Sequence, residues 1–257
     1  MTDIHRFEFD GEAAQFEGFD WLLECRRLAL SAGTVERRSP AGESFLLVLA
    51  GTHDIHAGGG SWMRRGIRDR PDAGRPLGIF LPPDTPYRLE HGSGSALVWS
   101  VRQPELPEPE SPRQSLSTKP LLPMAGSGKA FDPATGTWKP KEAFLASPEA
   151  ILPRRIRRFE HDGVGVERIL DADYKALGLM LDEVVLEDGE TLSGLTPERP
   201  ACEIGIYFEA DVGLTIGDSE RTGIGVVAVS GSTVPTLRSA GGRAYASIVY
   251  AGPDASA

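Results

Sequence analysis

The hydrophobic and polar positions along the chain follow two dense strand-and-turn patterns. In the first, at about residues 20–102, turn residues separate short apolar runs, as in LGIFLPPDTPYRLEHGSGSALVWSV. The second, at about 164–252, has five strand candidates. They are VGVERIL, ALGLMLDEVVLEDGE, ACEIGIYFEADVGLTIGD, GIGVVAVSGSTVPTL and RAYASIVYAGP. Strands of about five residues at this spacing are typical of antiparallel sandwiches and barrels, so the pattern predicts an all-β protein.

The two strand-rich stretches share a layout. Each has a long apolar strand with an early glutamate that ends at a small residue and glycine, ESFLLVLAG in one and EIGIYFEADVG in the other. Each then has a short strand, a Pro- or Gly-bearing turn, and a closing strand, ALVWSV or YASIVYAG. This matched order indicates an internal duplication of one β-barrel unit.

The stretch between them is rich in proline and serine. Residues 102–129 are typical of an extended linker, and prolines limit the following segment to a short helix. We therefore expect an N-terminal barrel over 1–102, a linker with a short helix over 103–160, and a C-terminal barrel over 161–257.

Composition and charge narrow the class of partner. The 257 residues carry a net charge of −10, which disfavours a nucleic-acid partner. We expect Cys25 and Cys202 to be reduced, with Cys202 a buried structural thiol. No stretch has the apolar core of a signal peptide or the roughly 20 apolar residues that span a bilayer. These features predict a cytoplasmic protein without membrane contact.

Several stretches together resemble the KduI/IolB isomerase family. In the first half they are LALSAGTVERR, LLVLAGTHDIHAGG, IRDRP and GIFLPPDTPYRL. In the second half they are VERIL with LGLMLDEVVLEDGETLSG, and the ending VVAVSGSTVPTLRSAGGRAYASIVYAGP. The resemblance implies a bicupin, with two cupin-type barrels in tandem. It also implies aldose–ketose isomerisation of a uronate such as 5-deoxyglucuronate, in inositol breakdown, by a divalent metal on three histidines and one glutamate.

The sequence departs from the family at these metal ligands. The family has Pro-Pro-His-x-His-Asp before the ligand glutamate, whereas this chain has Leu-Thr-Pro-Glu-Arg-Pro at 195–200. Glu203 stands where the ligand glutamate should be, and no histidine follows His161. We therefore expect no metal and no other cofactor. A weakly bound divalent cation is the alternative, although oxygen-only cation sites normally need more ligands.

The strand after residue 202 supplies the candidate catalytic residues. Glu203 and Tyr207 share one of its faces, and Ile204, Ile206 and Phe208 share the other. If the resemblance orients the polar face into the barrel, Glu203 is the acid or base and Tyr207 is the hydroxyl donor. In the alternative interpretation the polar face is exposed and the Ile/Phe face forms the core.

The loop before this strand supplies the expected substrate contacts. They are Thr196, Glu198 and Arg199, with Arg199 as the clamp for a substrate carboxylate. Two basic stretches, 61–72 and 153–158, are interpreted as solvated surface, with contact to an acidic ligand or a partner subunit as the alternative.

Two histidines resemble metal ligands at first sight. His53 and His56 are three residues apart on a predicted strand, so they point to opposite faces. We interpret the strand as an exposed edge strand or a hairpin strand before the glycines at 58–60. A metal bound by one of these histidines with His91 and Glu43 is the alternative.

Three functions follow from the sequence. The first is an isomerase of the KduI/IolB kind that acts on a small sugar acid, and the second is a metal-free cupin that binds a small carbohydrate-like ligand. The third is a structural partner of a catabolic enzyme. Strand edges and apolar faces of this kind often pair, so we also expect a homodimer.

Overall fold

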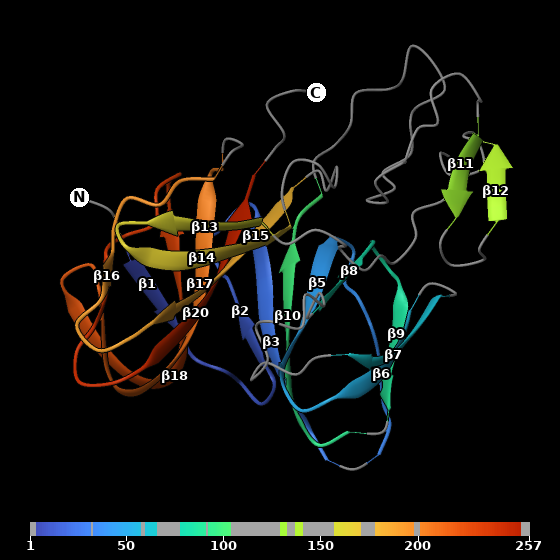
Figure 1. The fold of residues 1–257 in the computed structure, drawn as a ribbon, viewed down its shortest axis with the longest axis horizontal. Coiled ribbons are helices and arrows are strands. Elements are labelled where there is room, and N and C mark those ends of the chain that lie inside the picture. Colours follow the sequence, from blue (N-terminus) through green and yellow to red (C-terminus); the bar gives the residue numbers. More distant parts are fainter. Residues whose placement is uncertain are drawn as a thin grey trace.

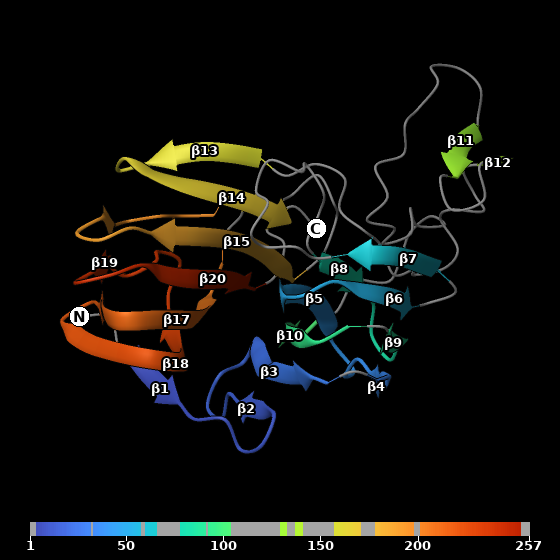
Figure 2. The same cartoon turned by 60° about the horizontal axis from the view of Figure 1, so that its bottom comes forward.

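The computed structural model describes residues 4–31, 33–57, 60–65, 78–90, 92–103, 129–132, 137–140, 157–170, 178–197 and 201–252. Every regular element in these ranges is a β-strand, so the all-β prediction is confirmed. No helix within them is long and apolar enough to cross a membrane. The strands form two halves that lie side by side (Figures 1 and 2).

The N-terminal half consists of two antiparallel sheets. The larger sheet has the order β2 (Ala13–Gln15), β3 (Leu22–Leu30), β10 (Gly94–Val101), β5 (Glu43–Ala50) and β8 (Gly78–Leu81). The smaller sheet has the order β4 (Val35–Arg38), β9 (Pro86–Glu90), β6 (His53–Ala57) and β7 (Gly60–Arg65). Alternate side chains of both sheets pack face to face in one apolar interior, which includes Leu28, Leu46, Ile55 and Leu89.

The C-terminal half is a nine-stranded antiparallel sheet. Its main path has the order β1 (Ile4–Phe7), β18 (Ser219–Ser230), β17 (Glu203–Ile216), β20 (Ala244–Ala251), β15 (Leu179–Leu186), β14 (Val164–Leu170) and β13 (Arg157–His161). Off this path, β16 (Thr191–Leu192) pairs with β19 (Leu237–Ser239), which also pairs with β17. Side chains of β16 and β19 pack with those of the main path in a second apolar interior, which includes Met180, Leu192, Ile206 and Leu237.

The first strand crosses the expected boundary between the halves. Ile4 of β1 lies opposite Val229 of β18, so residues 4–7 extend the C-terminal sheet (Figure 1). At the other limit, β13 begins at Arg157, before the expected start at 161. Most of the expected linker lies outside the described residues, apart from the antiparallel pair β11 (Lys129–Asp132) and β12 (Thr137–Pro140). The short helix was expected within 139–158; the two ends of this segment belong to β12 and β13, and 141–156 lie outside the described residues.

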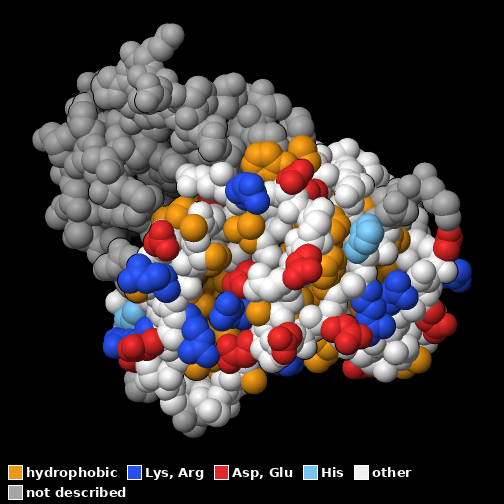
Figure 3. All heavy atoms as spheres, turned by 180° about the vertical axis from the view of Figure 1, so that it is seen from behind, with side chains coloured by type: hydrophobic (Ala, Val, Ile, Leu, Met, Phe, Trp, Pro, Cys, Tyr) orange, Lys and Arg blue, Asp and Glu red, His pale blue; other side chains and the backbone are white. Residues whose placement is uncertain are grey.

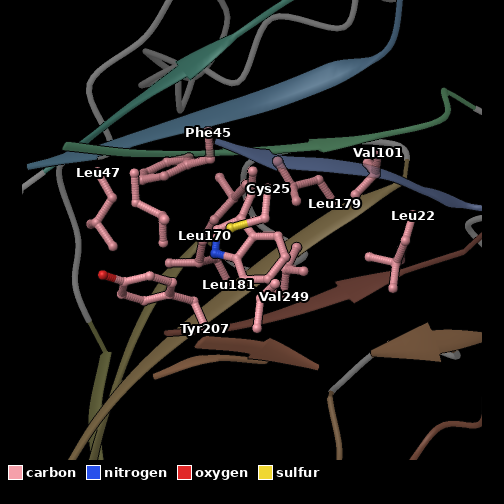
Figure 4. Packing of buried hydrophobic residues seen from close by; sticks show 14 of the residues in the cluster. Leu22, Cys25, Phe45, Leu47, Val101, Leu170, Leu179, Leu181, Tyr207 and Val249 are labelled. Atoms are coloured by element: carbon pink, nitrogen blue, oxygen red, sulfur yellow. The ribbon is translucent and has the colours of Figure 1, made fainter. Parts of the chain in front are cut away.

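The two halves meet along a surface that we call the seam. The larger sheet of the N-terminal half and the sheet of the C-terminal half turn their outer faces toward each other, and the buried side chains of both faces form one cluster (Figure 4). Trp99 of β10 lies against Gly205 of β17, where an added Cβ atom would be 2.7 Å from the indole ring. The indole Nε1 of Trp99 donates to the Oγ of Ser247 at 3.0 Å. The seam is therefore a continuous hydrophobic core that fixes the halves against each other.

Candidate functional site

Glu203, at the position of the family's ligand glutamate, begins β17 and lies in the seam. Its Oε1 accepts the backbone N–H of Asp20 at 2.7 Å, and its Oε2 accepts those of Trp21 at 2.9 Å and Leu22 at 2.8 Å. Only 7% of the residue is exposed. Hydrogen bonds to an ionised acceptor are about twice as strong as neutral ones. Glu203 therefore fastens the start of β3, in the N-terminal half, to the C-terminal sheet.

The predicted orientation of β17 is wrong. Ile204, Ile206 and Phe208 pack in the interior of the C-terminal half, so Glu203 and Tyr207 point away from it, toward the N-terminal half. The alternative is confirmed for the Ile/Phe face, which forms the core, but its exposed polar face is wrong, because Tyr207 is fully buried. The physical reason is that the N-terminal half covers the outer face of this sheet, so both faces of β17 are buried.

The structure does not bring the two candidate catalytic residues together. Glu203 and Tyr207 are four positions apart on one strand, which is about 13 Å at a rise of about 3.3 Å per residue. One small ligand atom cannot contact both side chains over that span. Their catalytic roles stay predictions, and the hydrogen bonds of Glu203 give this carboxylate a separate, structural task.

Glu43 has the same role in the opposite direction. It begins β5, is 1% exposed, and its Oε2 accepts the backbone N–H of Gly178 at 2.8 Å, just before β15. The strand register agrees, because Glu43 lies opposite Val101 and Glu203 lies opposite Ala251, each at the end of the closing strand of its half. We call Glu43 and Glu203 the glutamate clamps. Each half uses its early glutamate to hold the first residues of the equivalent strand in the other.

The residues at the family's metal position do not fit a metal ion of that kind. Both oxygens of Glu203 are directed at backbone donors, and its inward neighbours on β17 are Ile204 and Ile206. No imidazole exists at 195–200, and the described residues contain no group of three or more His, Cys, Asp or Glu side chains arranged as metal ligands. Zinc and similar ions prefer nitrogen and sulfur ligands, which this position does not offer.

The interior of the C-terminal half contains a buried polar group that was not predicted from the sequence. Asp182 of β15 binds Arg168 of β14 through two hydrogen bonds, at 2.8 and 2.9 Å, and accepts a third from the Tyr250 hydroxyl at 2.9 Å. The Phe159 ring lies 5.1 Å from the guanidinium carbon. Burial, then the adjacent Asp182 carboxylate, raises the pKa of Tyr250 well above its ordinary value. The available signal was the lone aspartate in the apolar run LGLMLDEVV.

A second polar group lies in the seam itself. The Nε of Arg27 on β3 donates to the Tyr207 hydroxyl at 3.1 Å, and this hydroxyl donates to Glu209. The Nη2 of Arg27 is 3.8 Å from the Glu209 carboxylate. Beside them, the Tyr245 hydroxyl donates to Glu183. We call these five residues the seam cluster.

Burial governs the chemistry of Tyr207. Removal from water, then the hydrogen bond to Glu209, raises the pKa of Tyr207 above its ordinary value, and the opposing effect of Arg27 is smaller. The hydroxyl therefore stays protonated and remains a donor. Figure 4 shows it at the edge of the apolar side chains, pointing away from them.

The remaining site predictions lie elsewhere. Thr196 is exposed in the loop between β16 and β17 and is not a member of the seam cluster. Glu198, Arg199, His91 and most of the basic stretches lie outside the described residues. On the face in Figure 3, acidic and basic side chains are interspersed.

The strand of the two histidines is a hairpin strand and not an edge strand. β6 pairs antiparallel with β7, the next strand in the chain, so the hairpin interpretation is confirmed. β6 also pairs with β9 on its other side, so the edge-strand interpretation is wrong. His53 is 1% exposed, and its Nε2 is 3.2 Å from the carbonyl oxygen of Ala50. The Nδ1 of His56 is 2.9 Å from Ser61 Oγ, and its Nε2 is 3.4 Å from the Glu90 carboxylate.

The prediction for Cys202 is also wrong. Cys202 is exposed, because it lies just before β17 rather than within it. Cys25 is the buried thiol, and burial raises its pKa well above the ordinary value. Both cysteines are free, as expected.

Comparison with solved structures defines the fold. The chain is similar to an IolB-like protein from Salmonella typhimurium LT2, with a TM-score of 0.62 and 16% identity over 97% of this chain and 92% of that one. It is also similar to a serine-to-alanine mutant of oxalate decarboxylase from Bacillus subtilis, with a TM-score of 0.55 and 13% identity over 98% of this chain and 76% of that one. A tryptophan-to-tyrosine variant of that decarboxylase gives a TM-score of 0.55 at 11% identity, with the same coverage.

These likenesses, at such low identity, concern the fold alone. They confirm the predicted bicupin architecture. No protein-family model matches the sequence. No curated protein matches it either.

Proposed function

We propose that this protein is an IolB-like bicupin that binds a small sugar acid without the metal-dependent isomerisation of the KduI/IolB family. The observation that carries the proposal is the environment of Glu203. Its carboxylate is directed at three backbone donors in the seam, and Ile204 and Ile206 occupy the inward positions beside it. The ligand class rests on the family resemblance in the motifs of both halves, and the likeness to an IolB-like structure supports it.

A second candidate is the isomerisation itself, on a uronate such as 5-deoxyglucuronate. The observation that favours it is the extent of the structural likeness, which covers 97% of this chain and 92% of the IolB-like protein. Under this candidate Glu203 and Tyr207 are the acid and base, and Thr196, Glu198 and Arg199 hold the substrate. Sugar-acid isomerisation needs a stabilised enediolate oxygen, and a metal supplies that stabilisation in the family.

Calorimetric titration combined with proton NMR separates the two candidates. The purified protein is titrated with glucuronate and 5-deoxyglucuronate, and the same solutions are followed over time with added Mn, Zn, Fe or Ni, or with EDTA. We expect saturable heat that EDTA leaves unchanged, and aldehyde signals that stay constant.

Each other result changes the conclusion. Ketone signals that need a metal would establish isomerisation and overturn our proposal. Absence of both heat and turnover would remove both ligand-based candidates and leave the structural-partner function.

A further inference from the structure

The two faces of the seam differ at equivalent positions. In the N-terminal half, the row next to Trp99 across β5, β10 and β3 is Leu47, Leu97 and Arg27. In the C-terminal half, the same row across β17, β20 and β15 is Tyr207, Ser247 and Glu183. One half thus places two leucines where the other places a phenol and a hydroxyl.

Burial of the polar side chains in the C-terminal row costs free energy, and close packing alone does not require them. Burial of a polar group costs free energy unless hydrogen bonds compensate, and the N-terminal row shows that leucine fits such positions. The indole of Trp99 accounts for Ser247, which accepts its hydrogen. Glu183 and Tyr245, which are 6% and 7% exposed, hydrogen-bond to each other, so a second polar pair is buried beside Tyr207. Buried ionisable groups in a seam between two halves are typical of binding sites.

The seam cluster is partly exposed to solvent at one end. The side chains of Arg27 and Glu209 are 30% and 29% exposed, whereas Tyr207, Tyr245 and Glu183 lie deeper. Glu209 lies directly opposite Tyr245 on the neighbouring strand, so the two tyrosine–glutamate pairs are adjacent. Arg27 and Glu209 are therefore the most exposed members of the cluster, and the two tyrosines lie behind them.

We propose that the seam cluster is the site at which the sugar acid binds. Arg27 offers a guanidinium that pairs with the ligand's carboxylate, and Glu209 accepts hydrogen bonds from its hydroxyl groups. The half-buried ring of Phe9, 6.3 Å from that of Tyr207, offers an apolar surface to the C–H groups of a sugar ring. This inference rests on the proposed function and places its ligand outside both barrel interiors.

Glucuronate titration of matched variants tests the site. Arg26 is the control for Arg27, because both are on β3, both pair with a glutamate and both side chains are 30% exposed, but Arg26 pairs with Glu24 away from the seam cluster. Removal of one charge-assisted contact weakens binding by about tenfold or more, so we expect that loss for Arg27→Gln. Tyr207→Phe, which keeps the ring, should weaken binding less, and Arg26→Gln should bind as the wild type does. Glucose, which lacks the carboxylate, should bind more weakly than glucuronate.

The outcomes separate the site from the function. If the wild type binds glucuronate but Arg27→Gln and Tyr207→Phe bind equally well, the site lies elsewhere and the proposed function stands. Loss of binding in Arg199→Ala would then place it at the 196–199 loop. If the wild type binds no sugar acid, the proposed function fails and the site with it. Equal weakening in Arg26→Gln, with lowered melting temperatures throughout, would overturn the site in favour of general destabilisation.

Discussion

The N-terminal and C-terminal halves begin their seam strands alike and then diverge. Glu43 and Glu203 occupy equivalent positions, and each clamps backbone N–H groups of the opposite half. Four residues further along, Leu47 in one half corresponds to Tyr207 in the other. The two glutamates hold the halves together, and each half has one. Tyr207 has no such counterpart in the N-terminal half, so we infer that it does more than hold the halves together.

The interior of the C-terminal half also contains a buried polar group. Arg168 and Asp182 form an ion pair there at 4% and 0% exposure, packed among apolar side chains. Substitutions at structural residues should lower the free energy of unfolding, whereas substitutions at residues that serve a ligand should change it little. Stability measurements therefore distinguish the two kinds of residue.

The largest loss of stability should follow Asp182→Ala. Removal of Asp182 breaks a buried, doubly hydrogen-bonded ion pair, which costs about 3–5 kcal/mol of unfolding free energy. Urea denaturation followed by tryptophan fluorescence measures it. The double variant Arg168→Met/Asp182→Leu is the control and should lose less, because no buried charge remains. A smaller loss in the single variant than in the double one would contradict this account.

Substitutions at the glutamate clamps should cause the second-largest loss of stability. Glu203→Ala leaves the N–H groups of Asp20, Trp21 and Leu22 without their acceptor, at about 1 kcal/mol each or about 3 kcal/mol in total. Glu43→Ala should also destabilise, because it releases the N–H of Gly178. The same denaturation experiment measures both. Unchanged stability in Glu203→Ala together with an altered sugar-acid response would show that Glu203 belongs to a ligand site and is not a clamp.

The third-largest loss of stability should follow a substitution at Gly205, which packs closely against Trp99 in the seam. In Gly205→Ala, the new Cβ would be 2.7 Å from Trp99 and 2.8 Å from Val249, so the halves must separate locally, at about 1–3 kcal/mol. Gly165→Ala on β14 is a matched control, because nothing lies within 4 Å of its Cβ position. Thermal unfolding of the two variants should therefore differ, with only Gly205→Ala lowering the melting temperature. Equal melting temperatures would mean that Trp99 does not pack as described.

The sequence predicted the fold better than the site, for a physical reason. Apolar alternation and turn residues are local signals, and they predicted strands such as 43–50 and 244–251 correctly. Which face of β17 turns inward depends on what covers the other face, and that is a second half some 180 residues away in the chain. For the same reason the contacts of Arg27 could not be predicted, because its partners Tyr207 and Glu209 come from the other half. The role of Asp182 could have been predicted from the sequence, because a charged residue in an apolar strand needs a buried partner.

The smallest effect on stability should come from Tyr207→Phe. The change removes only a hydroxyl whose partners, Arg27 and Glu209, are both partly exposed and can bind water instead, so the loss should stay within about 1 kcal/mol. Tyr250→Phe is the comparison, because it leaves the fully buried Asp182 short of a hydrogen bond at about 1–3 kcal/mol. Urea denaturation ranks the two tyrosines. If Tyr207→Phe cost as much as Tyr250→Phe, the seam hydroxyl would be structural, and the asymmetry between the halves would need no ligand to explain it.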